Sequence, residues 1–175
     1  MGYHEEMRRL LAVALLVSAP PAFAAQAVAV SVEELARTSD AVIRGRVLEA
    51  TAAWSEDHRR IYTTFEVRRD SVLRGRAPAR PRVVVPGGVI GGVGQRVDAA
   101  PTIAPGEDVV LFLQRTKAGT FHVNGFAQGK FTVEGRVARP DLSHLTFQES
   151  SIRAAERRVE EMPLAELERR VRSTR

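Results

Sequence analysis

A pair of extended apolar stretches on either side of a short polar turn constrains the fold of this chain more than any other feature. Residues 41–54 carry valine, isoleucine and leucine, and residues 59–67 alternate between apolar and polar side chains. Such alternation is the period of a strand with one buried face. The polar segment 55–58 supplies the turn. We therefore predict a long antiparallel hairpin, in which Gly45 permits a bulge or a sharp coil.

Later parts of the chain predict further strands with no helix between them. The second strand should end at residues 72–75, and apolar runs predict strands at the positions 82–85, 108–114, 121–123 and 129–137. Residues 87–106 are rich in glycine and contain prolines, so we expect a mobile, mostly exposed loop there. The pattern predicts five or six strands of uneven length.

Helices are expected at the two ends of this strand region. Ser31 and Glu34 form a capping box that predicts a helix from Val32 to about Thr38. In the tail, Ser150 or Ser151 can cap a first helix, whose apolar stripe consists of Ile152, Ala155, Val159 and Met162. Pro163 opens a second helix, whose apolar residues are Leu164, Leu167 and Val171. We expect both tail helices to pack on the strands.

The amino-terminal residues have the pattern of an export signal. Arg8 and Arg9 precede an apolar run, and Ala22-Phe23-Ala24 provides a cleavage site after Ala24. Glu5 and Glu6 would cancel the two arginines, so we predict that translation starts at Met7. The apolar run is too short to span a bilayer, and no membrane span is expected after cleavage.

This pattern predicts a secreted or periplasmic protein with three parts. Residues 1–24 are the signal peptide, residues 25–138 form a barrel domain with its amino-terminal helix, and residues 139–175 form a helical extension packed on the barrel.

Composition limits the means of stabilisation and the classes of partner. The chain has no cysteine, so neither disulfides nor a lipid-modified cysteine can form. The formal net charge is +5, but acidic residues are interleaved with the arginines. No single-sign block appears, and we therefore predict no nucleic-acid binding.

The sequence contains no recognisable catalytic or cofactor motif. The glycine-rich run 87–94 is not followed by the lysine and serine or threonine of a phosphate-binding loop. The histidines His58, His122 and His144 lie far apart in the sequence. Only His144, near Asp141 and Glu149, leaves room for an adventitious metal site. We predict no enzyme, no cofactor and no metal.

Four segments together resemble a known family. Residues 40–47, 62–67, 72–75 and 105–113 are similar in order and residue type to the barrel of tissue-inhibitor-of-metalloproteinase and netrin-like modules. This resemblance implies a barrel of the oligonucleotide/oligosaccharide-binding (OB) type. The inhibitors of that family chelate zinc through an amino-terminal cysteine, which this chain lacks. The expected fold class is thus mainly β: a small five- to six-stranded OB-like antiparallel barrel with a short amino-terminal helix and carboxy-terminal helices.

OB-type barrels bind ligands across one sheet face between two loops, which places a candidate site on this chain. The candidate partner-binding residues are Trp54, His58, Arg59, Arg60, Tyr62, Arg115 and Lys117. An aromatic side chain among cations suits stacking and anionic or sugar groups. The alternative is that Trp54 caps the end of the barrel and the arginines are solvated.

Two functions follow as expectations. The first is a non-enzymatic binding module for an extracytoplasmic protein or glycan. The alternative is an accessory regulator or inhibitor of a secreted metalloprotease that works without a cysteine.

Overall fold

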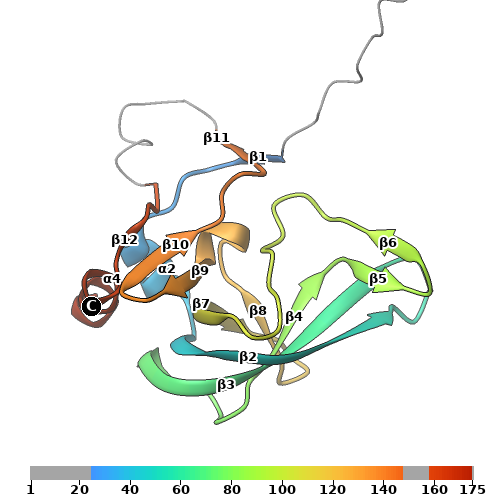
Figure 1. Cartoon of the computed structure of the whole chain (residues 1–175), viewed down its shortest axis with the longest axis horizontal. Coiled ribbons are helices and arrows are strands. Elements are labelled where there is room, and N and C mark those ends of the chain that lie inside the picture. Colours follow the sequence, from blue (N-terminus) through green and yellow to red (C-terminus); the bar gives the residue numbers. More distant parts are fainter. Residues whose placement is uncertain (1–24, 148–157, 175) are drawn as a thin grey trace, which may run out of the picture.

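Five strands close a small β-barrel in the computed structural model, which describes residues 25–147 and 158–174 (Figure 1). The strands follow one another around the barrel in the order β2-β3-β4-β8-β7, and β7 pairs with β2 to close it. Their bounds are β2 Ala41–Trp54, β3 Ile61–Gly75, β4 Arg82–Pro86, β7 Asp108–Arg115 and β8 Phe121–Val123. All neighbours are antiparallel except β4 and β8, which are parallel. The predicted mainly β fold with a small barrel is confirmed.

The predicted long hairpin is formed by β2 and β3, paired from Ala41↔Gly75 to Trp54↔Ile61. Its register shifts at three places, one of which lies between Arg44 and Gly45. A side chain at Gly45 would bring a Cβ within 2.3 Å of the Arg68 carbonyl oxygen. Only glycine allows the two strands to approach this closely, so the hairpin bends here.

Strand β7 belongs to two hydrophobic cores at once. Val109, Leu111 and Leu113 point into the barrel, whereas Val110 and Phe112 point to a second core outside it. Because both faces of β7 are buried, its sequence is a continuous apolar run and does not alternate between apolar and polar residues.

Two helices cover the second core. Helix α2 (Val32–Thr38) begins at Ser31, whose hydroxyl accepts a hydrogen bond from the Glu34 N–H, as predicted. Helix α4 (Leu164–Ser173) follows Pro163, and its predicted apolar residues Leu164, Leu167 and Val171 are buried. Within residues 25–147 and 158–174, no helix has the length and apolar character that crossing a bilayer requires.

The remainder of the tail departs from the prediction. Ile152 and Ala155 lie outside the described residues, so most of the first predicted tail helix does too. Val159 is buried but not helical, and Met162–Pro163 forms the short strand β12. Strand β12 pairs with β10 (Val137–Pro140), because extended chain beside an open sheet edge gains hydrogen bonds.

Several other strands lie beyond the barrel. The single strand predicted at 129–137 is two, β9 (Lys130–Glu134) and β10, which pair with each other, because Gly135 with a φ of +60° lies in the turn between them. A short 3₁₀ helix, η1 (Phe126–Gly129), precedes β9. The unpredicted strands β1 (Ala25–Ala27) and β11 (Leu145–Phe147) pair in parallel, so strands occupy part of the expected helical extension.

The glycine-rich segment 87–106 is more ordered than predicted. It contains a hairpin of β5 (Gly88–Ile90) and β6 (Val93–Gln95). Gly91 and Gly92 both have positive φ, +56° and +83°, as a two-residue type I′ turn requires. The rest of the segment has no strand and is mostly exposed, as expected, with Pro101 and Ile103 buried against the barrel.

Candidate functional site

The turn between β2 and β3 is held by a compact hydrogen-bond network. Asp57 accepts a hydrogen bond from the Ser55 hydroxyl at 2.6 Å and another from the Arg59 N–H at 3.2 Å. The hydrogen bond from Ser55 is the main reason why the pKa of Asp57 lies below its ordinary value. His58 has a φ of +53°, and its ring lies 6.3 Å from the ring of Trp54.

The β5–β6 hairpin is fastened to this turn through Gln95. The Gln95 amide oxygen accepts a hydrogen bond from the Ile61 N–H at 2.6 Å, and its amide nitrogen donates to the Arg59 carbonyl. Gly88 fits closely, since a Cβ there would lie 2.4 Å from the Thr63 hydroxyl oxygen. The two hairpins therefore form one projecting end of the molecule.

An open cleft of about 540 Å³ lies between these hairpins, the barrel and the loop that follows β6. Its walls include Ala50 and Thr63 of the long hairpin, Val85 of β4 and the segment 94–105. Most of these side chains are apolar. Arg96 and Asp98 bring charge to the cleft, which His144 also lines.

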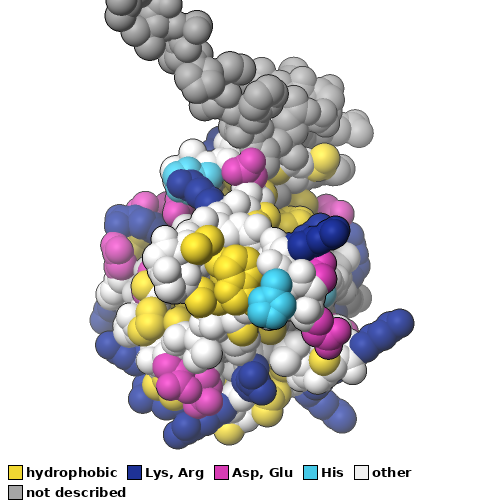
Figure 2. Space-filling view, turned by 90° about the vertical axis from the view of Figure 1, so that its right-hand side faces the viewer, with side chains coloured by type: hydrophobic (Ala, Val, Ile, Leu, Met, Phe, Trp, Pro, Cys, Tyr) yellow, Lys and Arg dark blue, Asp and Glu magenta, His cyan; other side chains and the backbone are white. Residues whose placement is uncertain are grey.

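Exposed valines lie on the β5–β6 hairpin and directly after it. Val89 is 68% exposed, Val93 53% and Val97 36%. Val89 and Val97 line the cleft, and we call these two side chains the valine face. Val89 pairs with Gly94 and Ile90 with Val93, so the Val93 side chain lies on the opposite face of the hairpin from Val89. Figure 2 views the end of the molecule from which both hairpins project, where hydrophobic side chains lie among charged ones. Clusters of exposed apolar side chains commonly mark interaction sites.

The predicted site residues separate into two groups. Trp54, His58, Arg59, Arg60 and Tyr62 lie together at the tip of the β2–β3 hairpin, where Trp54 is partly buried and Arg59 and Arg60 are exposed.

Arg115 and Lys117 form the other group, at the end of β7 and in the turn that follows. The Arg115 N–H donates to the Asp40 carboxylate, which directly precedes β2, and its guanidinium lies 4.7 Å from the centre of the Phe121 ring. Asp40 and Trp54 stand at the two ends of the 14-residue strand β2. Within the described part of the chain, no polar contact joins the two groups, and the structure does not bring them together.

The residues considered for metal binding are also dispersed. Across residues 25–147 and 158–174, no three histidine, aspartate or glutamate side chains converge. His122 is hydrogen-bonded to Gln114 at 2.9 Å. Asp141 accepts a hydrogen bond from the Ser143 hydroxyl, which is the main reason that its pKa is lowered, and Glu149 lies outside the described residues.

The valine face was not predicted from the sequence, although a signal for it was present. Gly91-Gly92 stands between apolar residues, which is the pattern of a tight hairpin and not of an irregular loop. A two-residue hairpin of short strands cannot bury both of its faces, so exposed valines would have followed from that pattern.

No family model matches this chain, and neither a curated protein nor a solved structure matches it.

Proposed function

We propose that this chain is an exported, non-catalytic module that binds a protein partner through the valine face and the adjoining cleft. The observation that carries the proposal is that two exposed valines, Val89 and Val97, line an open cleft whose walls are mostly apolar. Exposed Arg59 and Arg60 at the hairpin tip would form part of a polar rim around an apolar centre, which is the usual anatomy of a protein interface.

The chemistry of this face favours a protein over a glycan. Valine side chains offer methyl groups and no hydrogen bond to a sugar hydroxyl, which would lose its water on binding. Export is supported by the amino-terminal sequence pattern.

The proposal is tested by capture in the native host. The full chain with a carboxy-terminal tag is produced there, cross-linked outside the cytoplasm, and its partners are identified by mass spectrometry. Val89→Ser with Val97→Ser should abolish capture of a specific protein, whereas Val28→Ser with Val72→Ser, at exposed valines elsewhere, should leave it intact.

Three outcomes would contradict the proposal. The protein could remain in the cytoplasm, the valine variants could capture the same proteins as the wild type, or a glycan could be the molecule retained. A captured secreted metalloprotease would favour the regulator alternative.

A further inference from the structure

The loop that joins β3 to β4 interrupts the interleaving of acids with arginines. Residues 74–82 contain four arginines and no acidic residue. Two prolines in this segment restrict its backbone. The backbone N–H groups of Arg69 and Val67 on β3 donate to carbonyls of the loop, at 3.0 and 3.1 Å. The arginines are therefore carried on a backbone with a fixed course.

Three chain segments meet at the end of the barrel where this loop begins. Gly75, the last residue of β3, has a φ of +70°, and a Cβ there would lie 1.9 Å from the Asp40 carbonyl oxygen. Only glycine permits this contact between β3 and the start of β2. The Arg115 N–H donates to the Asp40 carboxylate at 2.7 Å, which brings the end of β7 to the same place. The cleft and Trp54 lie toward the other end of β2.

Two guanidinium groups are held close together on this loop. The Arg115 guanidinium donates to the Arg76 carbonyl at 3.4 Å, and the Arg69 guanidinium donates to the Ala77 carbonyl. Arg76 and Ala77 are consecutive, so their Cα atoms are only about 3.8 Å apart. A guanidinium has several N–H donors, and a single carbonyl leaves most of them available to a ligand.

Two further cations stand at the same end of the barrel. Arg76 and Lys117 are both exposed. We call the following four side chains the basic end: Arg69, Arg76, Arg115 and Lys117. Within the described residues, none of them takes part in an ion pair. Cations gathered without counter-charges repel one another, and an anionic ligand removes that repulsion.

We propose that the basic end binds an acidic segment of a partner protein through the carboxylates of that segment. A guanidinium matches the two oxygens of a carboxylate with a pair of parallel hydrogen bonds. Arginine is also among the residues that most often dominate the binding energy of protein interfaces. The inference goes beyond the proposed function, because it adds a second surface with a different chemistry from that of the valine face.

The surroundings of the basic end favour a protein over a membrane or a nucleic acid. Glu66, which pairs with Arg80 of the loop, and Asp70 place acidic groups along the same strand. An anionic membrane and a nucleic acid present continuous negative charge, which these acids repel. A protein can place single carboxylates beside the cations. Phe121, beneath the Arg115 guanidinium, is fully buried and offers no surface on which a base could stack.

The test measures the fluorescence anisotropy of a labelled octaglutamate peptide with the full chain, and an octaglutamine peptide is the neutral control. Arg76→Gln with Lys117→Gln should weaken octaglutamate binding by about tenfold or more, because two cations leave the site. Arg59→Gln with Arg60→Gln removes the same charge from exposed arginines toward the other end of β2. At physiological ionic strength that distance is screened, so the affinity should stay within about twofold.

Thermal unfolding separates this effect from misfolding. Within the described residues, no hydrogen bond or ion pair involves the side chain of Arg76 or Lys117. The double variant should therefore keep the melting temperature of the wild type. Octaglutamate should also bind the Val89→Ser and Val97→Ser double variant with unchanged affinity, which separates this surface from the valine face.

Each contrary result is decisive. No octaglutamate binding, equal binding of octaglutamine, or an equal loss in the two arginine double variants would overturn the inference. Tighter binding to phosphatidylglycerol vesicles or to a DNA duplex, lost on changing Arg76 and Lys117, would assign the basic end to a membrane or a nucleic acid and would also overturn it. Octaglutamate binding lost only in the valine variant would place the peptide in the cleft, against this inference, and would leave the proposed function standing.

Discussion

Lys130 is the one charged residue that is buried in the described part of the chain, with a side chain 3% exposed. Its ammonium group lies 3.2 Å from a carboxylate oxygen of Glu107 and 2.5 Å from the Thr132 hydroxyl. The same Glu107 oxygen accepts a hydrogen bond from the Ala104 N–H. This pair therefore ties the end of the glycine-rich segment to β9.

The two partners of this ion pair should differ in their contribution to stability. Glu107→Gln leaves a buried ammonium without its counter-charge and should cost about 3–5 kcal/mol of unfolding free energy. Lys130→Met removes the buried charge. The Glu107 side chain that it leaves unpaired is 26% exposed and can be hydrated, so the loss of unfolding free energy should be about 1–2 kcal/mol. Urea unfolding of both variants and the double variant measures the difference. A Lys130→Met cost equal to that of Glu107→Gln would contradict this account.

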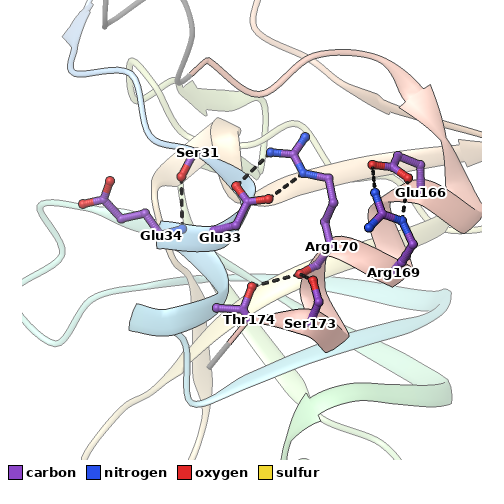
Figure 3. Close-up of polar contacts among 8 residues, drawn as sticks. All are labelled: Ser31, Glu33, Glu34, Glu166, Arg169, Arg170, Ser173 and Thr174. Carbon is purple, nitrogen blue, oxygen red and sulfur yellow. Dashed lines mark hydrogen bonds and ion pairs between the residues drawn. The ribbon is translucent and has the colours of Figure 1, made fainter.

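At the scale of elements, a bidentate ion pair joins helix α4 to helix α2. The Arg170 guanidinium donates to both carboxylate oxygens of Glu33, at 2.6 and 2.8 Å (Figure 3). Hydrogen bonding from Arg170 is the main reason that the pKa of Glu33 is lowered. Figure 3 also shows that the Glu34 carboxylate, on the same turn of α2, points away from Arg170.

The Arg170–Glu33 ion pair should make the free energy of unfolding depend on pH. A lowered pKa means that the stabilisation is present above the unfolded-state pKa and is lost as pH falls through the folded-state value. Glu33→Gln should therefore destabilise the protein at pH 7, by no more than about 1 kcal/mol because the Glu33 side chain is 43% exposed. The difference from the wild type should shrink in urea unfolding at acidic pH. Glu34→Gln is the control, and an equal effect there would argue against the pair.

The β5–β6 hairpin depends on Gln95 for its attachment. Gln95→Ala removes the hydrogen bonds to Ile61 and Arg59, so the hairpin should separate from the long hairpin more often. Trypsin should then cleave after Arg96 faster than in the wild type. Gln114→Ala, which breaks side-chain contacts with Thr38 and His122 elsewhere, should leave this rate unchanged. A similar rate in both variants would show that Gln95 does not restrain the segment.

Elements with local signals were predicted from the sequence, and those that depend on distant partners were not. The helix start at Ser31 and the alternation in β3 are local patterns, and the structure contains both. Of the predicted capping box only the Ser31 half forms, because the Glu34 carboxylate points away from Ser31 (Figure 3). Strands β1 and β11 were missed because each has only three residues, too few to show an alternating or continuous apolar pattern. Only their pairing with each other identifies them as strands. The general ligand-binding geometry of OB-type barrels placed Arg115 beside Trp54, and the structure puts them at opposite ends of β2. The burial of Lys130 also depends on residues distant in the sequence, so local patterns could not reveal it.

At the scale of the whole molecule, β7 couples the barrel to the helical layer, because its two faces belong to the two cores. Loss of either core removes the packing on one face of this strand. The barrel and helices should therefore unfold together as one cooperative unit.

A variant in α4 tests this coupling. Leu167 is fully buried, and Leu167→Ala should cost about 2–5 kcal/mol. Trp54, the single tryptophan, lies at the tip of β2, far from α4 in Figure 1, and reports on the hairpin by fluorescence. Fluorescence and far-ultraviolet circular dichroism should show the same lowered midpoint. A fluorescence midpoint that stays at the wild-type value would show that the cores are independent.

The attachment of the amino-terminal segment also affects the order in which the chain can fold during its synthesis. The Gln128 side chain bonds to the backbone of Val28 and Val30, 100 and 98 positions earlier, and β1 pairs with a strand that ends at Phe147. The ribosome makes these partners roughly 100 or more residues later, so the first residues of the folded region lack them until most of the chain has emerged. Docking of this amino-terminal segment therefore comes late, well after the β2–β3 hairpin has both of its strands available.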